Sequence, residues 1–387
     1  MFHKRGLVLK YQHPGETGYD KDARADRPSG RRSEGLSLPA GRPAAVLLVL
    51  LLLLALILSV AAPPSPAVTP DAWQFTGSGW GHGVGLCQYG ARAMASAGHD
   101  HEAILAYYYT GTRVTHFNCP SSIRIGLLNR VSQVELSAER GSFTFYTPQG
   151  EVPGGVVMPG GIWTLSPGSN GRLIIRRPDG SILDPGGHGS EHSPLFLKGS
   201  SPGDILRLPG RSNRGYSRLS TEHPMEFNIF ADAGAFKLRA ILVSGFEDYL
   251  KGVAEVPAAW PAEAQKVQAV AARGYAVSSM GKHAASNFDL TDGTGCQNYQ
   301  GVDKEKDAAW IQAVEQTAGR ILVHGDRVAL TFYSASCGGH TDSNHDVWGG
   351  IPPALPGGGS LPLVHDRRKP LCQLVGLLYS CPAGRAP

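Results

Sequence analysis

Beyond residue 43 the sequence lacks a net charge of either sign. The 387 residues include 36 Lys and Arg against 32 Asp and Glu. Residues 1–43 hold nine of the basic and five of the acidic ones, so the remainder carries 27 of each. Proteins that bind nucleic acid through its phosphates need a net basic surface. We therefore expect no nucleic-acid partner.

Long uninterrupted stretches without Gly or Pro are scarce, since the chain contains 50 Gly and 28 Pro. Such a composition disfavours an all-helical fold, because these residues interrupt helices and favour turns. With 42% hydrophobic and 18% charged residues the composition is that of a globular protein. The length suits one large domain or two ordinary ones.

The hydrophobic pattern predicts helices at the two ends of a β-rich stretch. Helices are expected over four ranges: 88–97, 101–109, 262–277 and 306–317. Between residues 119 and 243 short β runs alternate with Gly, Pro and Asn turns. A hairpin is expected from 320–323 and 328–334 around a Gly325-Asp326 turn. We predict an α+β fold, a mixed helical and β domain with an inserted β-rich region that is barrel- or sandwich-like.

Residues 44–62 form a charge-free run of Ala, Leu, Val and Ile, broken only by Ser59. This run is long enough to span a bilayer. Arg42 and other basic residues precede it, which places residues 1–43 in the cytoplasm and the rest outside. We predict a single-pass anchor in the cell membrane. The alternative is a signal peptide cleaved near Ala61, which gives a secreted protein; in both cases the folded part is exported.

Residues 79–91, GWGHGVGLCQYGA, place a glycine at every second position of their first half. Glycine leaves the backbone uncovered, so a ligand can lie on the peptide groups, with Trp80 and His82 as the large side chains beside it. The alternative is a tight glycine turn that leads into a helix, with His82 as a structural residue. The sequence leaves both interpretations open.

Glu255 lies in a turn-rich segment before a helix that begins near Pro261. Val253, Val256 and Trp260 surround it in the sequence, and apolar surroundings disfavour the charged form of a carboxyl group. A carboxyl group that stays protonated near neutral pH can act as a general acid. The alternative is a helix-capping role, since the helix dipole favours an anion at this end. Glu263, in the first turn, is the competing carboxylate.

Two sets of motifs resemble the stage II sporulation protein D family. The first set lies around Glu255, within residues 249–275, and continues in the Cys-Gln-Asn-Tyr motif that ends at Tyr299 and in the segment 333–348. The second is the glycine-histidine block 79–91 with residues 104–112. In the usual family order this block follows the Glu-bearing segment, so the domain looks circularly permuted here. The permuted order makes a direct counterpart of the sporulation protein less expected.

The resemblance implies a lytic transglycosylase that cleaves the MurNAc–GlcNAc bond of peptidoglycan glycan strands. Glu255 would be the general acid and base, and the products would carry a 1,6-anhydro ring. The substrate-binding residues implied by position are the following six: Trp80, His82, Gln88, Tyr89, Arg273 and Tyr299. The alternative is a non-enzymatic wall-binding module that stimulates a cell-wall amidase, since similar domains occur in amidase enhancers.

Six cysteines, an even number, lie in the exported part. Disulfides are the expected state there, and we predict a Cys296–Cys337 bond and, with less support, Cys87–Cys119. Some members of the family hold zinc with a His and two Cys, and here Leu290 stands at the middle position. We therefore expect no cofactor. The less favoured alternative is zinc held by the following residues: His283, Cys296, Cys337 and His340.

These inferences divide the chain into seven parts. They are a disordered tail (1–43), the anchor or signal (44–62), a linker (63–74), the first part of the catalytic domain (75–118), the inserted β-rich region (119–240), the main catalytic part (241–350) and an irregular tail (351–387).

Overall fold

The computed structural model describes residues 79–210 and 214–349. The predicted tail 1–43, the span 44–62, the linker 63–74 and the tail 351–387 lie outside the described residues. Within the described ranges, none of the helices is both long enough and apolar enough to traverse a bilayer.

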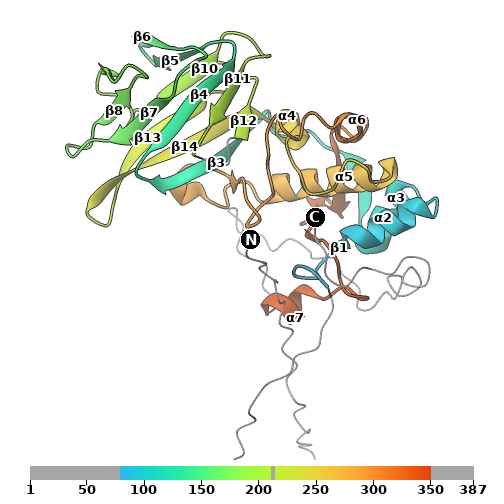
Figure 1. Ribbon diagram of the computed structural model, residues 1–387. Coiled ribbons are helices and arrows are strands. Elements are labelled where there is room, and N and C mark those ends of the chain that lie inside the picture. The colour runs from blue at the N-terminus through green and yellow to red at the C-terminus, as the bar shows by residue number, and fades with distance from the viewer. Residues whose placement is uncertain (1–78, 211–213, 350–387) are drawn as a thin grey trace, which may run out of the picture. The chain divides into compact units, whose positions relative to one another are not determined.

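Two large sheets form the β-rich part of the structure (Figure 1). The larger sheet has seven strands, antiparallel except at one edge, in the order β15 (Leu290–Thr291), β3 (Ser122–Val131), β14 (Ala235–Gly245), β13 (Met225–Asp232), β10 (Leu195–Gly199), β5 (Phe143–Thr147) and β6 (Gly150–Val157). The second has six strands, in the order β12 (Arg214–Tyr216), β11 (Ile205–Leu208), β4 (Val134–Arg140), β7 (Trp163–Pro167), β8 (Leu173–Arg176) and β9 (Ile182–Leu183).

The two sheets share one apolar core, which is formed by the buried side chains that alternate with less buried ones along their strands. Strand β5 shows the alternation, with Phe143 and Phe145 fully buried. Trp163 of β7 and Leu206 of β11, from the second sheet, belong to the same buried cluster. Period-two alternation is what a half-buried strand requires. The predicted α+β fold with a β-rich region is therefore confirmed.

Most of the helices gather beside the sheets, with α5 at their centre, and α7 lies apart from this group (Figure 1). They are α2 (Gln88–Ser96), α3 (His101–Tyr108), α4 (Phe246–Lys251), α5 (Ala262–Ser278), α6 (Ala308–Gln316) and α7 (Asn344–Trp348), with a short 3-10 turn at Ala284–Ser286. Helix α5 contacts α2, α3, α4 and α6. Twelve of its 17 residues are buried, which is why its sequence is rich in Ala and Val on all sides.

Caps fix where these helices begin. The Asp100 side chain accepts a hydrogen bond from the Ala103 amide at the start of α3, and Asp307 does the same for Trp310 at the start of α6. Pro261 directly precedes α5, where its missing N–H has no cost. The predicted helices accordingly begin within two residues of the observed ones.

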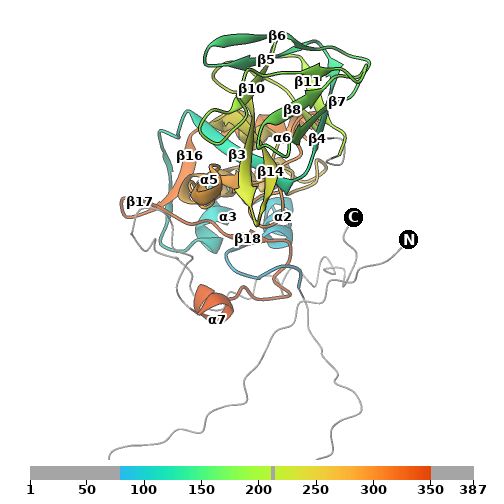
Figure 2. The same cartoon turned by 90° about the vertical axis from the view of Figure 1, so that its left-hand side faces the viewer.

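Two small sheets join the N-terminal part of the described chain to its C-terminal part. Strand β1 (Leu86–Cys87) pairs in parallel with β18 (Tyr333–Ser334), and β2 (Arg113–His116) pairs with β16 (Arg320–His324), which also pairs with β17 (Arg327–Val328). The expected hairpin is therefore right only at its turn. Its second arm leaves β16 after β17 and passes to β1 beside α2 (Figure 2).

Strand β14 crosses the boundary at residue 240 that the sequence suggests between the inserted region and the main catalytic part. It pairs with β13 on one side and with β3 on the other, and it continues directly into α4. The sheet and the helical part are thus linked by a continuous strand.

Candidate functional site

Asn298 forms hydrogen bonds with the backbone of Ala254 and with the side chain of Glu255. Its carbonyl accepts the Ala254 amide at 2.7 Å, its side-chain amide donates to the Ala254 carbonyl at 2.9 Å, and its own N–H donates to Oε1 of Glu255 at 2.7 Å. A bridge between Val253 and Tyr299 extends this pairing. The backbone position of Glu255 is therefore fixed by contacts 43 or more residues away in sequence.

The turn after Glu255 is fixed by the first turns of α5. The buried Gln265 side chain donates to the carbonyls of Ala258 and Trp260, at 3.0 and 2.9 Å. Lys304 donates to the Val256 carbonyl at 2.9 Å. These bonds satisfy backbone carbonyl groups that have no partner in a helix or sheet. The loop is therefore fixed although it has no regular secondary structure.

Burial raises the pKa of Glu255 above its ordinary value. The hydrogen bonds from the Asn298 amide and from the Tyr333 hydroxyl, at 2.7 and 3.3 Å, both favour the anion and act in the opposite direction. Removal of the carboxylate from water outweighs them. Glu255 is thus a half-buried carboxyl group whose neutral form is stabilised.

Glu263, the competing carboxylate, has the opposite electrostatics. Burial works toward a higher pKa, but Lys266 at 2.7 Å and His101, through its ring and its backbone amide, lower the pKa of Glu263 to about 2. Such a group remains ionised and holds no proton to donate. The structure therefore distinguishes the two carboxyl groups that the sequence left in competition.

The glycine-histidine block reaches Glu255 across 167 residues of sequence. The buried Gln88 side chain donates to the Glu255 carbonyl at 3.4 Å and to Gln268 of α5 at 3.1 Å. Tyr89, the next residue, packs its ring edge against Trp260, with the ring centroids 5.3 Å apart. Both predicted residues therefore lie at the segment that carries Glu255.

Apolar packing on α5 holds the block in this place. Leu86, Met94, Ile104 and Leu105 are buried in one cluster with Val267, Val270 and Ala271 of α5. The hydroxyl of Tyr109 also donates to the carbonyl of Phe332 at 2.8 Å.

Comparison with known proteins relates part of this chain to one family. The family model of the stage II sporulation protein SpoIID matches residues 236–324, from β14 to the end of β16. These residues form a SpoIID-family domain. The predicted circular permutation stays a prediction, because the match does not include the glycine-histidine block.

The relatives of the SpoIID-family domain share only part of their length with this chain. An uncharacterized protein of Brachyspira hyodysenteriae is 45% identical over 116 residues, which is 29% of this chain and 31% of that protein. In Bacillus subtilis, the amidase enhancer is 39% identical over 27% of this chain and 14% of its own length. The stage II sporulation protein D of that species is 47% identical over 45 residues, or 12% and 13%. No solved structure gives a significant match.

The glycines of residues 79–91 allow close packing against the chain's own residues 332–342. Gly79, Gly81, Gly83 and Gly85 all have positive φ, and a Cβ on any of them would collide with or press on residues 332–342. On the side where a Cβ would stand, this backbone is covered by residues 332–342 and is not open for a ligand. Ligand binding by this segment stays a prediction. The glycines let the chain's own C-terminal segment approach.

His82 is half-buried, and its ring forms hydrogen bonds to the backbone. Its Nδ1 accepts the Val84 amide at 3.0 Å, a second hydrogen bond goes to the Tyr333 backbone, and burial lowers its pKa. The ring also packs against Trp348, with centroids 5.0 Å apart. Trp348 and Trp80 are 40% and 45% exposed, so their indoles are the accessible aromatic faces near this histidine. A sugar-binding role for Trp80 and His82 stays a prediction.

The structure buries the side chains of Arg273 and Tyr299. Arg273 is completely buried and forms a two-pronged ion pair with Glu247 of α4, at 2.8 Å for each bond. Tyr299 is 4% exposed and stacks between Tyr216 and Tyr249. Both side chains join elements of the fold, and a glycan-binding role for them stays a prediction.

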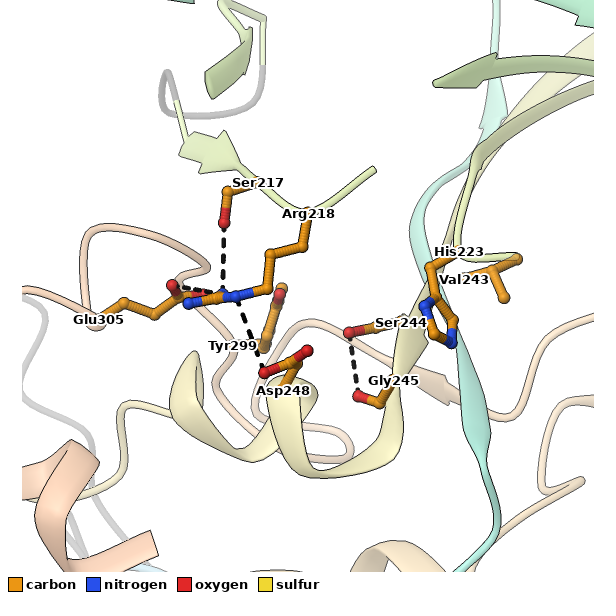
Figure 3. A pocket seen from close by; sticks show the side chains of 9 residues that line it. All are labelled: Ser217, Arg218, His223, Val243, Ser244, Gly245, Asp248, Tyr299 and Glu305. Carbon is orange, nitrogen blue, oxygen red and sulfur yellow. Dashed lines mark hydrogen bonds and ion pairs between the residues drawn. The ribbon is translucent and has the colours of Figure 1, made fainter. Parts of the chain in front are cut away.

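Figure 3 shows a polar pocket where the β-rich part meets α4. Arg218 crosses it and binds Glu305 at 2.6 Å, with Asp248 3.7 Å from its Nε. The edge of Tyr299 lines this pocket, whereas Glu255 and its hydrogen-bond partners do not. The residues of these ion pairs line the pocket, which is separate from the carboxyl site.

The residues proposed for zinc do not gather. Cys296 lies 3.4 Å from His283, but Cys337 lies against Cys87, whose sulfur accepts its backbone amide, and His340 is exposed. Leu290, at the position of the family's middle cysteine, is buried in β15 and offers no ligand. Across residues 79–210 and 214–349, no three His, Cys, Asp or Glu side chains are arranged to bind a metal ion.

The predicted disulfides do not form in the structure, since Cys119 and Cys296 are both free thiols. The positions of the two cysteines explain why the predicted Cys296–Cys337 bond does not form. Cys296 is held beside His283, and Cys337 is held at β1 by its contact with Cys87.

Sequence reasoning missed three groups around Glu255. Tyr333 lies in the segment 333–348, Gln297 lies in the Cys-Gln-Asn-Tyr motif, and Asn298 acts through its backbone N–H. A backbone donor has no signature in the sequence. Tyr333 and Gln297 are polar residues within motifs, which is the only signal that pointed to them.

Proposed function

We propose that the protein is a peptidoglycan lytic transglycosylase with Glu255 as general acid and base. The observation that carries the proposal is the raised pKa of Glu255, at the point where residues 88–89 meet the Glu-bearing segment. A general acid must be protonated near the working pH, and burial shifts the pKa of Glu255 in that direction.

The chemistry needs a single carboxyl group. Glu255 protonates the bridging oxygen of the MurNAc–GlcNAc bond as the bond from that oxygen to C1 breaks. The C6 hydroxyl of the same muramoyl residue attacks C1, and its proton returns to the Glu255 carboxylate. The product is a 1,6-anhydro ring, and the acid is regenerated. No second carboxylate is required as the nucleophile, unlike in most glycosidases.

The folded part would act outside the cell membrane, on glycan strands. The charge-free run 44–62 supports export, as anchor or signal. Supporting observations for the substrate are the SpoIID-family domain and a relative named for a role in sporulation. The exposed indoles of Trp80 and Trp348 offer flat apolar faces suited to sugar rings.

The test compares the purified full-length protein with two isosteric variants, Glu255→Gln and Glu263→Gln, on intact and peptide-stripped glycan strands. Mass spectrometry detects 1,6-anhydromuramoyl ends. Glu255→Gln is expected to lower the rate by roughly 10²–10⁴-fold, the usual contribution of a general acid. Glu263→Gln is the matched control and keeps the activity, because Glu263 holds no proton to donate. Absence of anhydro products from the wild type on both substrates would refute the proposal.

A second function is favoured by one relative, which carries the name amidase enhancer. In that function the protein binds the wall and stimulates an amidase without cleaving glycan. The same variants distinguish the two. An enhancer stimulates amidase release of peptides equally well with Glu255→Gln, and its wild type yields no anhydro ends.

A further inference from the structure

A chain of hydrogen bonds leads from the core to the carboxyl group of Glu255. The Tyr249 hydroxyl donates to Oε1 of Gln297 at 3.0 Å. Nε2 of Gln297 donates to the Tyr333 hydroxyl at 2.9 Å, and that hydroxyl donates to Oε1 of Glu255 at 3.3 Å. Tyr249 and Gln297 are both fully buried. Water therefore does not compete for the inner bonds of the chain.

The direction of the chain is set by a backbone carbonyl. Nε2 of Gln297 also donates to the Ala272 carbonyl of α5, at 3.3 Å. A carbonyl oxygen only accepts hydrogen bonds, so the NH₂ end of the amide must face it. The same NH₂ group faces Tyr333, and the amide oxygen is left for the Tyr249 hydroxyl. Rotating the amide by half a turn would place oxygen against oxygen at Ala272.

The Tyr333 hydroxyl consequently has one acceptor for its single hydrogen. It receives a hydrogen bond from Gln297, and the acceptor within reach is Oε1 of Glu255. Burial, with the nearby Glu255 charge, holds the pKa of Tyr333 well above its ordinary value, so the hydroxyl keeps this hydrogen. Oε1 also accepts the Asn298 amide at 2.7 Å. Two donors already point at this oxygen.

We propose that Gln297 is a positioning residue that fixes Tyr333 as a donor to Oε1 of Glu255 and thereby places the transferable proton on Oε2. If Oε1 carried the proton, that proton and the hydrogen of the Tyr333 hydroxyl would point at each other in the same hydrogen-bond position. Oε2 is thus the oxygen that delivers the proton to the leaving group and receives it back. Gln297 itself does not touch the carboxyl group. The use of this proton in catalysis rests on the proposed function, whereas its location on Oε2 does not.

The test measures the Glu255 pKa directly. The full-length protein is labelled with ¹³C at the glutamate carboxyl, and the Glu255 signal is assigned by its absence in Glu255→Gln. Tyr333→Phe removes one donor that favours the anion, so the Glu255 pKa is expected to rise by roughly one unit. Gln297→Glu offers Tyr333 a new acceptor, and it is expected to raise the Glu255 pKa as well. Combining it with Tyr333→Phe should give less than the sum of the two shifts.

Tyr249→Phe is the matched control, because it also removes a tyrosine hydroxyl from this chain of hydrogen bonds. The Ala272 carbonyl still orients Gln297 in this variant, so the Glu255 pKa should stay within about 0.3 units of the wild-type value. An unchanged pKa in Tyr333→Phe would overturn the proposal, as would an equal rise in Tyr249→Phe or full additivity in the double variant. Since the titration needs no turnover, failure of the proposed function would appear separately, as the absence of anhydro products.

Activity gives the second readout. The general acid works in its protonated form, so the rate falls as the pH rises through the Glu255 pKa. In Tyr333→Phe the alkaline limb of the kcat/KM profile should move up by the same shift that the titration gives, while kcat falls because the proton is no longer confined to Oε2. An unshifted limb would contradict the assignment.

Discussion

Leu105→Ala tests whether the glycine-histidine part and the Glu-bearing part fold as one unit. Leu105 of α3 is completely buried and belongs to the cluster that includes Val267 and Val270 of α5. Truncation removes about three methylene equivalents, worth roughly 2.4 kcal/mol of transfer free energy. The cavity left behind adds to this, so the free energy of unfolding should fall by about 3–4 kcal/mol.

Urea denaturation followed by tryptophan fluorescence measures this loss. With a slope of about 3 kcal/mol per molar for a domain of this size, the midpoint should fall by roughly 1 M. Glu102→Ala on the same helix is the control, because its ion pair with Arg320 is long and exposed, at 3.3 Å. Such a pair contributes about 0–1 kcal/mol. A separate early transition in Leu105→Ala, with α5 still protected from hydrogen exchange, would refute the single unit.

Three further predictions follow from the buried contacts. Arg273→Met leaves Glu247 without its partner and should lower the free energy of unfolding by about 3 kcal/mol; a raised KM with unchanged stability would instead show glycan binding. Gly85→Ala should abolish folding at 37 °C, because the new Cβ would collide with a carbonyl oxygen, whereas Gly98→Ala meets no atom within 4 Å and should cost only the strain of its positive φ. Glu263→Gln should lower the melting temperature at pH 7. The difference should shrink as the pH falls from about 4.5 toward 2, since the pKa of Glu263 is lowered to about 2 and the unfolded chain takes up the proton first.

The sequence predicted the elements whose signals are local. Helix α5 follows from Pro261 and a long Ala-rich run, and the predicted helix 101–109 coincides with α3. Glu255 stood out because apolar residues flank it. These signals involve neighbours in the chain, so the sequence alone contains them.

What the sequence could not give are contacts between distant segments. The glycines of residues 79–91 resemble an open ligand loop, and only the approach of residues 332–342 shows why they are needed. Arg273 has the residue type of a glycan ligand, yet its position on α5 turns it toward Glu247. The residue type predicts which groups a side chain can bind, whereas the fold determines which groups lie within its reach.

The contrast between Glu255 and Glu263 shows why the candidate acid needs opposing influences. Glu263 has partners strong enough to overcome burial, so it stays ionised and holds no proton to donate. Burial and the two donors Asn298 and Tyr333 act on the pKa of Glu255 in opposite directions. Burial has the larger effect, so the pKa is raised. A reaction in which one group first gives and then takes a proton requires this balance, and it should fail if either influence is removed.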